Sequence, residues 1–216
     1  MRLRVSGIGY ISGQILIAVI LCPILFIGAG TLNWLKGWLY FGISFFGLLI
    51  NMVTQALINP ELLNRRGERK TSIPTWDKIT GGFVLVFGLG LRILAGIDAV
   101  RCRWSSLPFW WTIVGLVIYL FAQSLIVWSM AVDPFFKALV QERKDNLIIV
   151  TGPYMVVRHP CYLGSILILN MSPLILGFVW AFILAACLIF TEIIRTFLED
   201  RIGKFQERQP DIVFSP

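Results

Sequence analysis

The chain has 216 residues, of which 57% are apolar and 14% are charged, and its formal net charge is +7 at pH 7. Its mean hydropathy is +0.79. A water-soluble domain of this length needs a far more polar surface, so the composition excludes most soluble folds. The basic residues lie in loops between apolar segments and form no amphipathic basic face, which argues against nucleic acid as a partner.

Four segments without any Asp, Glu, Lys or Arg are each long enough to cross a membrane. They cover residues 5–35, 37–58, 104–132 and 160–191. A helix rises about 1.5 Å per residue, so roughly 20 residues span a hydrocarbon core about 30 Å thick. A fifth stretch, 79–97, is interrupted only by Arg92 and is also expected to span.

The first four spans are predicted at residues 10–32, 37–58, 79–98 and 108–131. Gly28-Ala29-Gly30 resembles a signal-peptide cleavage site, but the apolar run before it is too long for a typical signal peptide. The sequence therefore favours a first helix that is retained.

The last apolar stretch, 160–191, has 32 residues and as a single straight helix would be about 48 Å long. That exceeds the thickness of the hydrocarbon core. Its middle holds Asn170, Ser172, Pro173 and Gly177, which favour turns or break helices. We predict a hairpin of two helices that enters the membrane and returns. One strongly tilted span is the alternative.

The distribution of basic residues predicts which side of the membrane each loop faces. With the N-terminus in the cytoplasm, that side holds Arg2, Arg4, Arg65, Arg66, Arg69, Lys70, Lys78, Lys137, Arg143, Lys144 and Arg158. The opposite side holds only Lys36, Arg101 and Arg103. This asymmetry follows the positive-inside rule and predicts that both termini are cytoplasmic.

Together these features predict an all-α, polytopic integral membrane protein with four transmembrane helices and a C-terminal membrane hairpin. We expect one domain over residues 1–216, made of a four-helix part, 1–131, and a hairpin region, 132–216. The four cysteines show no CxxC spacing, so neither a disulfide nor a metal site is predicted.

Polar residues gather on the two flanks of the predicted hairpin. The segment before it, 152–162, contains His159, the only histidine, and the segment after it, 192–201, contains Glu192, Arg195 and Glu199. These last three residues share one helical face. A returning hairpin brings the two flanks together at the cytoplasmic surface. They form either a functional site or a set of interfacial anchors that contact lipid headgroups.

Arg158-His159-Pro160-Cys161-Tyr162, followed after a hairpin-length apolar stretch by Glu199-Asp200, resembles a known signature. It is similar to that of the isoprenylcysteine carboxyl methyltransferase and phospholipid methyltransferase superfamily. Gly152-Pro153-Tyr154 resembles the block that precedes this signature. Asn59-Pro60-Glu61-Leu62-Leu63 with Arg66 is similar to the first cytoplasmic loop of bacterial members.

The resemblance implies methyl transfer from S-adenosylmethionine, bound on the cytoplasmic side, to a lipophilic acceptor that arrives from the bilayer. The acceptor is a prenylcysteine-like carboxylate, a lipid amine or a thiol. The implied cofactor-binding residues are Gly152, Pro153, Tyr154, Arg158, His159, Tyr162, Glu199 and Asp200. The implied catalytic residues are Arg195, which pairs with an acceptor carboxylate, and His159, which takes a proton from an ammonium acceptor.

Two other interpretations stay open at the level of sequence. Sterol reductases are similar in architecture, so an NADPH-dependent membrane reductase is the second hypothesis. A noncatalytic relative is the third, because residues 203–216 lack the tyrosine-containing basic segment that follows the acidic pair in the family.

Overall fold

The computed structural model describes residues 2–68, 75–105, 107–132 and 151–208, and every regular element in these ranges is helical. For residues 75–77, 181 and 198–208 the description covers the backbone alone. The α-helices are α1 (Val5–Ala29), α2 (Leu35–Ile58), α3 (Pro60–Gly67), α4 (Thr75–Gly96), α5 (Phe109–Val132), α6 (Pro160–Leu176) and α7 (Ala181–Arg208). A π-helical turn, η1 (Ile97–Cys102), continues α4, and a 3₁₀ turn, η2 (Gly152–Met155), precedes α6.

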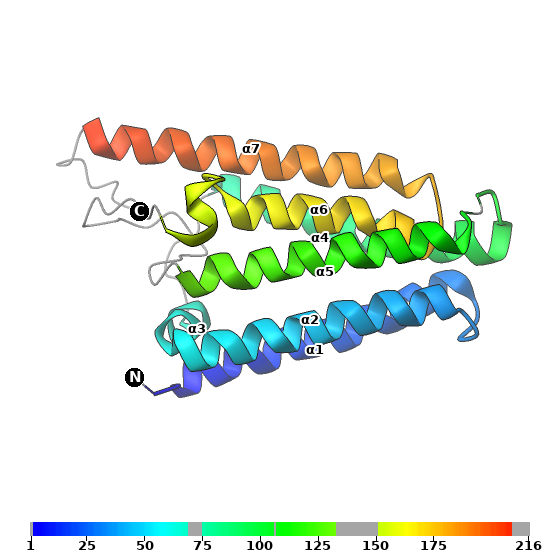
Figure 1. Ribbon diagram of the computed structural model, residues 1–216, viewed down its shortest axis with the longest axis horizontal. Helices are drawn as coiled ribbons and strands as arrows, with labels where there is room; N and C mark the ends of the chain where they lie inside the picture. Colours follow the sequence, from blue (N-terminus) through cyan, green and yellow to red (C-terminus); the bar gives the residue numbers. More distant parts are fainter. Residues whose placement is uncertain (1, 69–74, 106, 133–150, 209–216) are drawn as a thin grey trace.

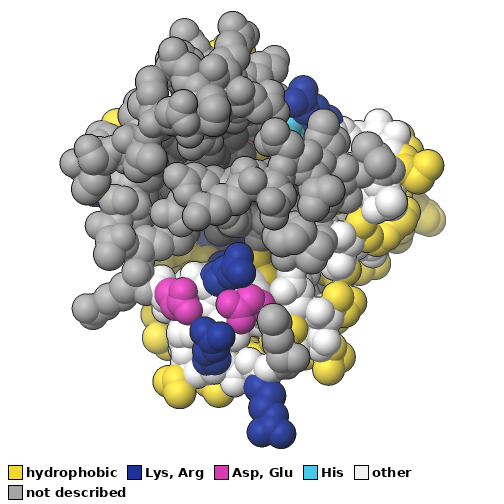
Figure 2. All heavy atoms as spheres, turned by 90° about the vertical axis from the view of Figure 1, so that its left-hand side faces the viewer, with side chains coloured by type: hydrophobic (Ala, Val, Ile, Leu, Met, Phe, Trp, Pro, Cys, Tyr) yellow, Lys and Arg dark blue, Asp and Glu magenta, His cyan; other side chains and the backbone are white. Residues whose placement is uncertain are grey.

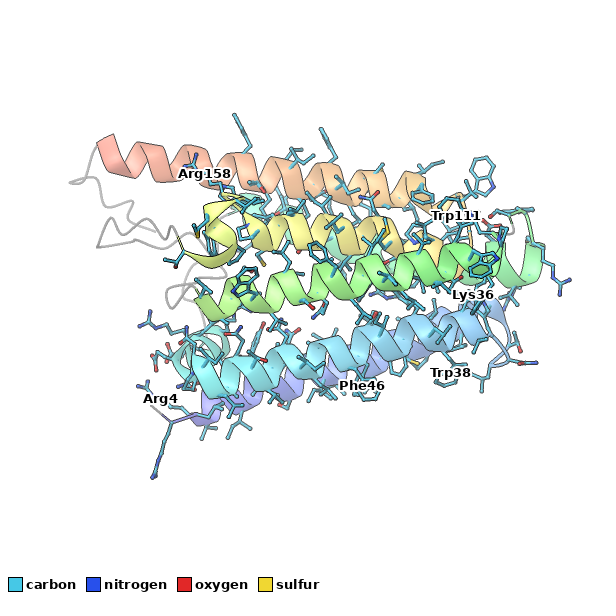
Figure 3. All side chains as sticks on the ribbon, viewed as in Figure 1. Arg4, Lys36, Trp38, Phe46, Trp111 and Arg158 are labelled. Atoms are coloured by element: carbon cyan, nitrogen blue, oxygen red, sulfur yellow. The ribbon has the colours of Figure 1, made fainter. Side chains whose placement is uncertain are left out.

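Four of these helices have the length and apolar composition of membrane spans: Val5–Ala29, Leu35–Ile58, Lys78–Cys102 and Phe109–Val132. The predicted all-α polytopic fold is therefore confirmed. Large apolar side chains cover the outside of the bundle, and Phe46 on α2 points away from the neighbouring helices (Figure 3). Trp38 and Trp111 lie at one end of the bundle (Figure 3). Membrane proteins are enriched in tryptophan at such positions, where the lipid meets water.

The long helices lie side by side, so the bundle has two ends (Figure 1). The end on the left in Figure 1, called the near end here, holds the N-terminus, α3, η2 and the start of α6. The far end holds the α1–α2 connection, η1 and the α6–α7 connection. Because α6 runs from the near end to the far end and α7 runs back, the predicted hairpin is present (Figure 1).

The turn of the hairpin lies at its last predicted breaker, Gly177, which has a φ of 86° and donates its N–H to the Pro173 carbonyl at 2.9 Å. The other predicted breakers, Asn170, Ser172 and Pro173, lie inside α6. The polar side chains of Asn170 and Ser172 do not interrupt the helix because each bonds to a carbonyl one turn earlier. Asn170 Nδ2 donates to the Ile166 carbonyl at 3.1 Å, and Ser172 Oγ donates to the Ile168 carbonyl at 2.8 Å.

The segment 59–78, which lies between the second and third predicted spans, contains the short helix α3. Asn59 begins it, since its side-chain oxygen accepts from the N–H of Leu62 at 3.2 Å, and Pro60 occupies the first turn. Sequence reasoning missed this helix because eight residues give little periodicity, although the cap and the proline are both visible in the sequence.

Hydrogen bonds through the buried Asp98 close the far end. The carboxylate accepts from the Ser105 N–H at 2.9 Å and from the Ser105 hydroxyl at 2.5 Å. Ser105 Oγ in turn accepts from the Val179 N–H at 3.0 Å, in the α6–α7 turn. Lys36 at the start of α2 donates to the Leu107 carbonyl at 2.8 Å (Figure 3). These bonds fix the hairpin turn to η1, α2 and the segment before α5.

Helices α5 and α6 pack closely along their whole length because glycines lie at their interface. A Cβ on Gly115 would lie 2.9 Å from Ile175 Cγ1, and a Cβ on Gly164 would lie 3.0 Å from the Ala122 carbonyl oxygen. Real Cβ contacts are rarely this short, so only glycine allows the observed separation. This contact sets how far the start of α6 projects at the near end.

Candidate functional site

Charged and polar side chains gather at the near end of the bundle, with apolar side chains around them (Figure 2). Four elements contribute to this end: α3, the end of α5, the η2–α6 junction and the second half of α7 (Figure 1). They include both flanks of the hairpin, as the sequence predicts.

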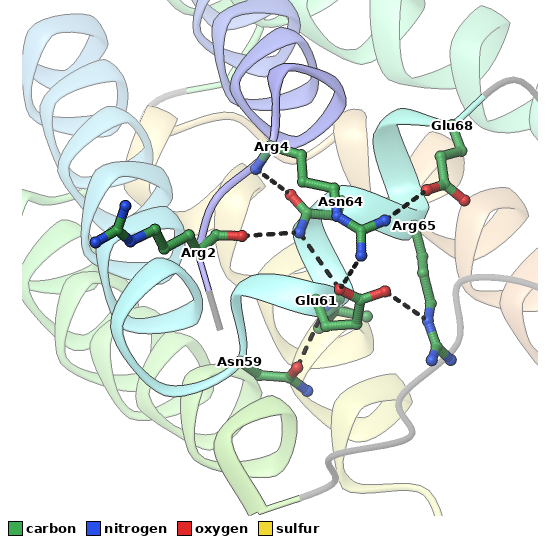
Figure 4. A network of polar contacts seen from close by, with 8 residues as sticks. Arg2, Arg4, Asn59, Glu61, Asn64, Arg65 and Glu68 are labelled. Carbon is green, nitrogen blue, oxygen red and sulfur yellow. Dashed lines mark hydrogen bonds and ion pairs between the residues drawn. The ribbon is translucent and has the colours of Figure 1, made fainter.

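The N-terminal segment holds α3 in place through Asn64, which is fully buried (Figure 4). Asn64 Oδ1 accepts from the backbone N–H of Arg4 at 2.8 Å, and Asn64 Nδ2 donates to the Arg2 carbonyl at 3.3 Å. The Asn64 side chain also donates to Glu61, and this bond lowers the pKa of the Glu61 carboxyl more than the nearby Arg4 and Arg65 do. The ion pairs of this group are exposed and contribute little on their own.

With α3 held in this way, Arg66 reaches into the bundle. Its Nη1 donates to the Tyr10 hydroxyl at 3.3 Å, and the guanidinium lies 5.9 Å from the centre of the Tyr10 ring. Arg66 also lies within electrostatic range of Cys161 at the start of α6. The first loop and the signature region therefore belong to the same cluster.

Cys161, inside the Arg-His-Pro-Cys-Tyr sequence, is the point where the four elements converge. Its thiol interacts with the side chain of Ser129 on α5 and lies within electrostatic range of Glu192 and Arg195 on α7. The neighbouring Pro160 and Ser129 are fully buried. The hairpin thus brings Glu192 and Arg195 within electrostatic range of a residue more than 30 positions earlier in the sequence.

The Gly152-Pro153-Tyr154 block forms η2 and packs on the end of α5. Gly152 has a φ of 61°, which favours glycine, and its Cα faces Trp128 and Val132. Pro153 is buried, and the Tyr154 hydroxyl donates to the Ser129 carbonyl at 3.4 Å. This block fixes the path of the chain into α6.

Arg158 is exposed at the near end (Figure 3), and His159 is half-buried immediately before α6. The His159 ring centre lies 5.9 Å from that of Tyr162, which is also half-buried. Arg158, His159, Tyr162 and Arg195 all have interaction partners within the protein. Glu199 and Asp200 lie in α7, but their side chains are outside the described part of the structure.

The hydrogen bonds of α2 show which of its residues lie at the same level as this cluster. Ser44 bonds to Tyr119, and Gln123 bonds to the carbonyl of Gly47, so α2 and α5 run in parallel with partners 75 and 76 positions apart. With this register, Ser129 on α5 lies at a height along the bundle axis between those of Asn51 and Gln55 on α2.

A hydrogen bond between α2 and α6 independently places Asn51 at the same height along the bundle as Cys161. Ser172 Oγ donates to the Tyr40 hydroxyl at 3.3 Å, and the two helices are antiparallel. Eleven residues further along α2 from Tyr40 is Asn51, and eleven residues back along α6 from Ser172 is Cys161.

Asn51 and Gln55 are candidate site residues that sequence reasoning missed. Gln55 is 1% exposed, and neither atom of its amide has a hydrogen-bond partner among the described residues; the same holds for Asn51 Oδ1. A buried amide left without partners costs about 1–3 kcal/mol. The signal in the sequence was two amides one helical turn apart in an otherwise uncharged span.

The chain is similar to known methyltransferases over this region. Residues 113–207 match the isoprenylcysteine carboxyl methyltransferase (ICMT) family. A protein-S-isoprenylcysteine O-methyltransferase from Dictyostelium discoideum is 39% identical over 89 residues, which cover 36% of this chain and 36% of that protein. The similarity thus spans about a third of the relative's length. No solved structure matches the chain.

The family match covers α5 from Ile113 onwards, η2, α6 and nearly all of α7. It therefore contains every one of the sequence-predicted site residues. Over residues 113–207, this chain is therefore similar to the isoprenylcysteine carboxyl methyltransferase family.

Proposed function

We propose that this protein is an S-adenosylmethionine-dependent methyltransferase that esterifies the carboxylate of a prenylcysteine-like acceptor delivered by the membrane. The observation that carries the proposal is the convergence of α3, α5, α6 and α7 at Cys161, inside the signature and within the family match. The similarity to an O-methyltransferase from Dictyostelium supports an oxygen atom as the methyl acceptor.

The residues at the near end fit such a cofactor. The buried Gln55 amide, without a partner in the described structure, offers both a donor and an acceptor to a polar ligand. Arg158, His159 and Tyr162 offer donors for a carboxylate and for ribose hydroxyls. Glu199 and Asp200 are proposed to accept from the ammonium group, and Gly152, Pro153 and Tyr154 are proposed to shape the turn before α6.

When bound, S-adenosylmethionine supplies a methyl group that is already activated on a sulfonium. The protein then has to align the acceptor, exclude water and supply charge. Arg195 is proposed to hold the acceptor carboxylate, because a guanidinium pairs with a carboxylate through two parallel hydrogen bonds. A carboxylate acceptor needs no base, so His159 acts as a base only for an ammonium acceptor.

The direct test combines cofactor binding with transfer. Purified protein is incubated with methyl-labelled S-adenosylmethionine and a farnesylated N-acetylcysteine, with NADPH as the competing cofactor. Base-labile label in the extracted product supports a methyl ester. Binding of NADPH in preference to S-adenosylmethionine would contradict the proposal and favour a reductase. Cofactor binding without transfer to prenylcysteine, lipid amine or thiol acceptors would indicate a noncatalytic relative.

We propose that the near end is cytoplasmic, together with both termini and the site. Arg2, Arg4, Arg65, Arg66 and Arg158 lie at this end, whereas the far end carries Lys36, Arg101 and Arg103. Membrane proteins place most of their loop arginines and lysines on the cytoplasmic side.

The first prediction tests this orientation with the exposed Cys102 at the far end. In intact cells a membrane-impermeant maleimide should label a variant that keeps only Cys102. A variant with a single cysteine in place of Glu68, which is exposed on the near-end surface, should be labelled only after the cells are opened. The reverse pattern would place the site on the outside and contradict the proposed topology.

The second prediction concerns cofactor affinity. His159→Ala and Glu199→Ala should each raise the Kd for S-adenosylmethionine roughly tenfold to hundredfold, because a hydrogen bond to a charged group contributes about 1.5–3 kcal/mol. Equilibrium binding in detergent measures this. Glu68→Ala is the matched control, since Glu68 is exposed and makes a 3.8 Å ion pair with the exposed Arg4. Unchanged affinity in both site variants would refute their assignment.

The third prediction separates acceptor binding from helix stabilisation at Arg195. Arg195→Lys keeps the positive charge but loses the planar fork, so turnover should fall at least tenfold while cofactor affinity changes little. Arg65→Lys is the control, because Arg65 makes an exposed pair with Glu61. Full turnover in Arg195→Lys, with loss of stability in Arg195→Ala, would make Arg195 a residue that only neutralises its helix neighbours.

The fourth prediction has opposite signs for stability and activity. Gln55→Leu should stabilise the protein by about 1–3 kcal/mol, since it removes a buried amide without partners, yet lower turnover several-fold. Gln123→Leu is the matched control. The Gln123 amide donates to the Gly47 carbonyl at 3.0 Å, so its loss should destabilise the protein. Thermal unfolding in detergent and the methyl-transfer assay measure both effects. A destabilised Gln55→Leu variant would show that the amide has a structural role.

A further inference from the structure

Arg92 lies inside the membrane span Lys78–Cys102, outside the near-end site described above. Ten residues separate it from the far end of that span, which corresponds to about 15 Å. Its Nη1 donates to the carbonyl of Gly88, one turn towards the near end, at 2.8 Å. The guanidinium therefore points towards the middle of the span rather than towards the nearer membrane surface.

The charge of Arg92 is not balanced by a carboxylate in the described part of the chain. The ion pairs found there lie at the near end, where they join Arg4 to Glu61 and Glu68 and Arg65 to Glu61. A guanidinium has five N–H donors, and the hydrogen bond to Gly88 uses one of them. A charged side chain at this depth costs several kcal/mol unless polar groups or water compensate. Arg92 is thus a strong candidate for binding an anion.

Arg92 borders a cavity of about 80 Å³ between α1, α2 and α4. Tyr40 and Ser44 of α2 also line it, together with Cys22 of α1 and apolar side chains such as Leu21 and Phe41. Apart from Tyr40 and Leu25, which are buried, the lining side chains are partly exposed, as expected for a cavity that opens towards the bilayer.

The hydroxyls in this cavity continue into a polar layer across the bundle. Ser44 Oγ lies 2.9 Å from the Tyr119 hydroxyl, and Ser172 Oγ donates to the Tyr40 hydroxyl at 3.3 Å. Arg92 therefore faces groups that donate hydrogen bonds, and the combination of a cation and hydroxyls suits an anionic ligand.

We propose that the Arg92 cavity binds the carboxylate of a long-chain monocarboxylate, the chemical class of the fatty acids, that enters from the bilayer. A carboxylate matches the guanidinium in geometry and charge. The volume also favours it. A cavity needs about 10–15 Å³ for each water molecule, so 80 Å³ corresponds to roughly five to eight waters and is large enough for a carboxylate.

The chain of the ligand would lie along apolar side chains of α1 and α2 that are exposed to lipid. Leu16, Ile20 and Phe46 are more than half exposed and lie near the lining residues in sequence. Seven residues of α2, about 10 Å, separate Ser44 from Asn51 at the near-end site. The proposed carboxylate site is therefore distinct from the methyl-transfer site and does not depend on that function.

The test uses Cys22 as a reporter inside the cavity, in the full-length protein with Cys102, Cys161 and Cys187 replaced by serine. The protein is placed in nanodiscs of zwitterionic phospholipid and treated with a membrane-permeant thiol reagent. Oleate should slow the modification of Cys22 at least tenfold, whereas methyl oleate, which has the same chain but no charge, should not. Equal protection by oleate and methyl oleate would overturn the proposal, because it would show that the acyl chain alone partitions nonspecifically into the cavity.

Variants then identify Arg92 as the anchor. Arg92→Gln should abolish the protection by oleate, and Arg92→Lys should weaken it several-fold because lysine lacks the planar fork. Arg103→Gln, which removes an exposed charge at the far end, should behave like the parent protein. Full protection in both Arg92 variants would overturn the proposal. The comparison of oleate with methyl oleate needs no Arg92 variant. It therefore tests carboxylate binding even if an Arg92 variant fails to fold.

Discussion

At Gly177 the backbone turns in the left-handed conformation, and α7 then runs back along α6 instead of leaving from the far end of the bundle. The bonds through Asp98 and Ser105 hold this turn to η1, so the direction of return is fixed at the far end. As a result Glu192 and Arg195 lie within electrostatic range of Cys161 at the near end. A single tilted span over the same residues would have carried Arg195 to the opposite side of the membrane.

The two ends of the bundle differ in how completely their described polar groups are hydrogen-bonded within the protein. At the far end the polar groups described are mostly engaged: Asp98 bonds to Ser105, and Lys36 bonds to a backbone carbonyl. At the near end Asn64 is satisfied by the N-terminal segment, whereas the amide of Gln55 lacks a partner within the described structure. Buried polar groups are usually paired, so an exception at the level of the signature residues is where a ligand is expected.

Close packing supports this arrangement without contributing chemistry. Gly115 and Gly164 let α6 approach α5, and Ser129, fully buried between them and the near end, interacts with Cys161. Small residues at helix interfaces allow such close contacts in membranes. There the hydrophobic effect does not drive helices together, so association depends on packing. The position of His159 at the start of α6 thus depends on contacts made along the whole helix.

The sequence by itself determined the four spans, the returning hairpin and the signature residues, because uncharged length, helix-breaking residues and short motifs are local properties of the chain. It did not determine where the hairpin turns, since the hydroxyl of Ser172 and the amide of Asn170 bond within α6 and keep it helical. Nor did it reveal Asn51, Gln55 or the surroundings of Arg92. Only the tertiary structure decided these, because the level of a side chain in the membrane and the partners it lacks depend on the register between helices that are distant in sequence.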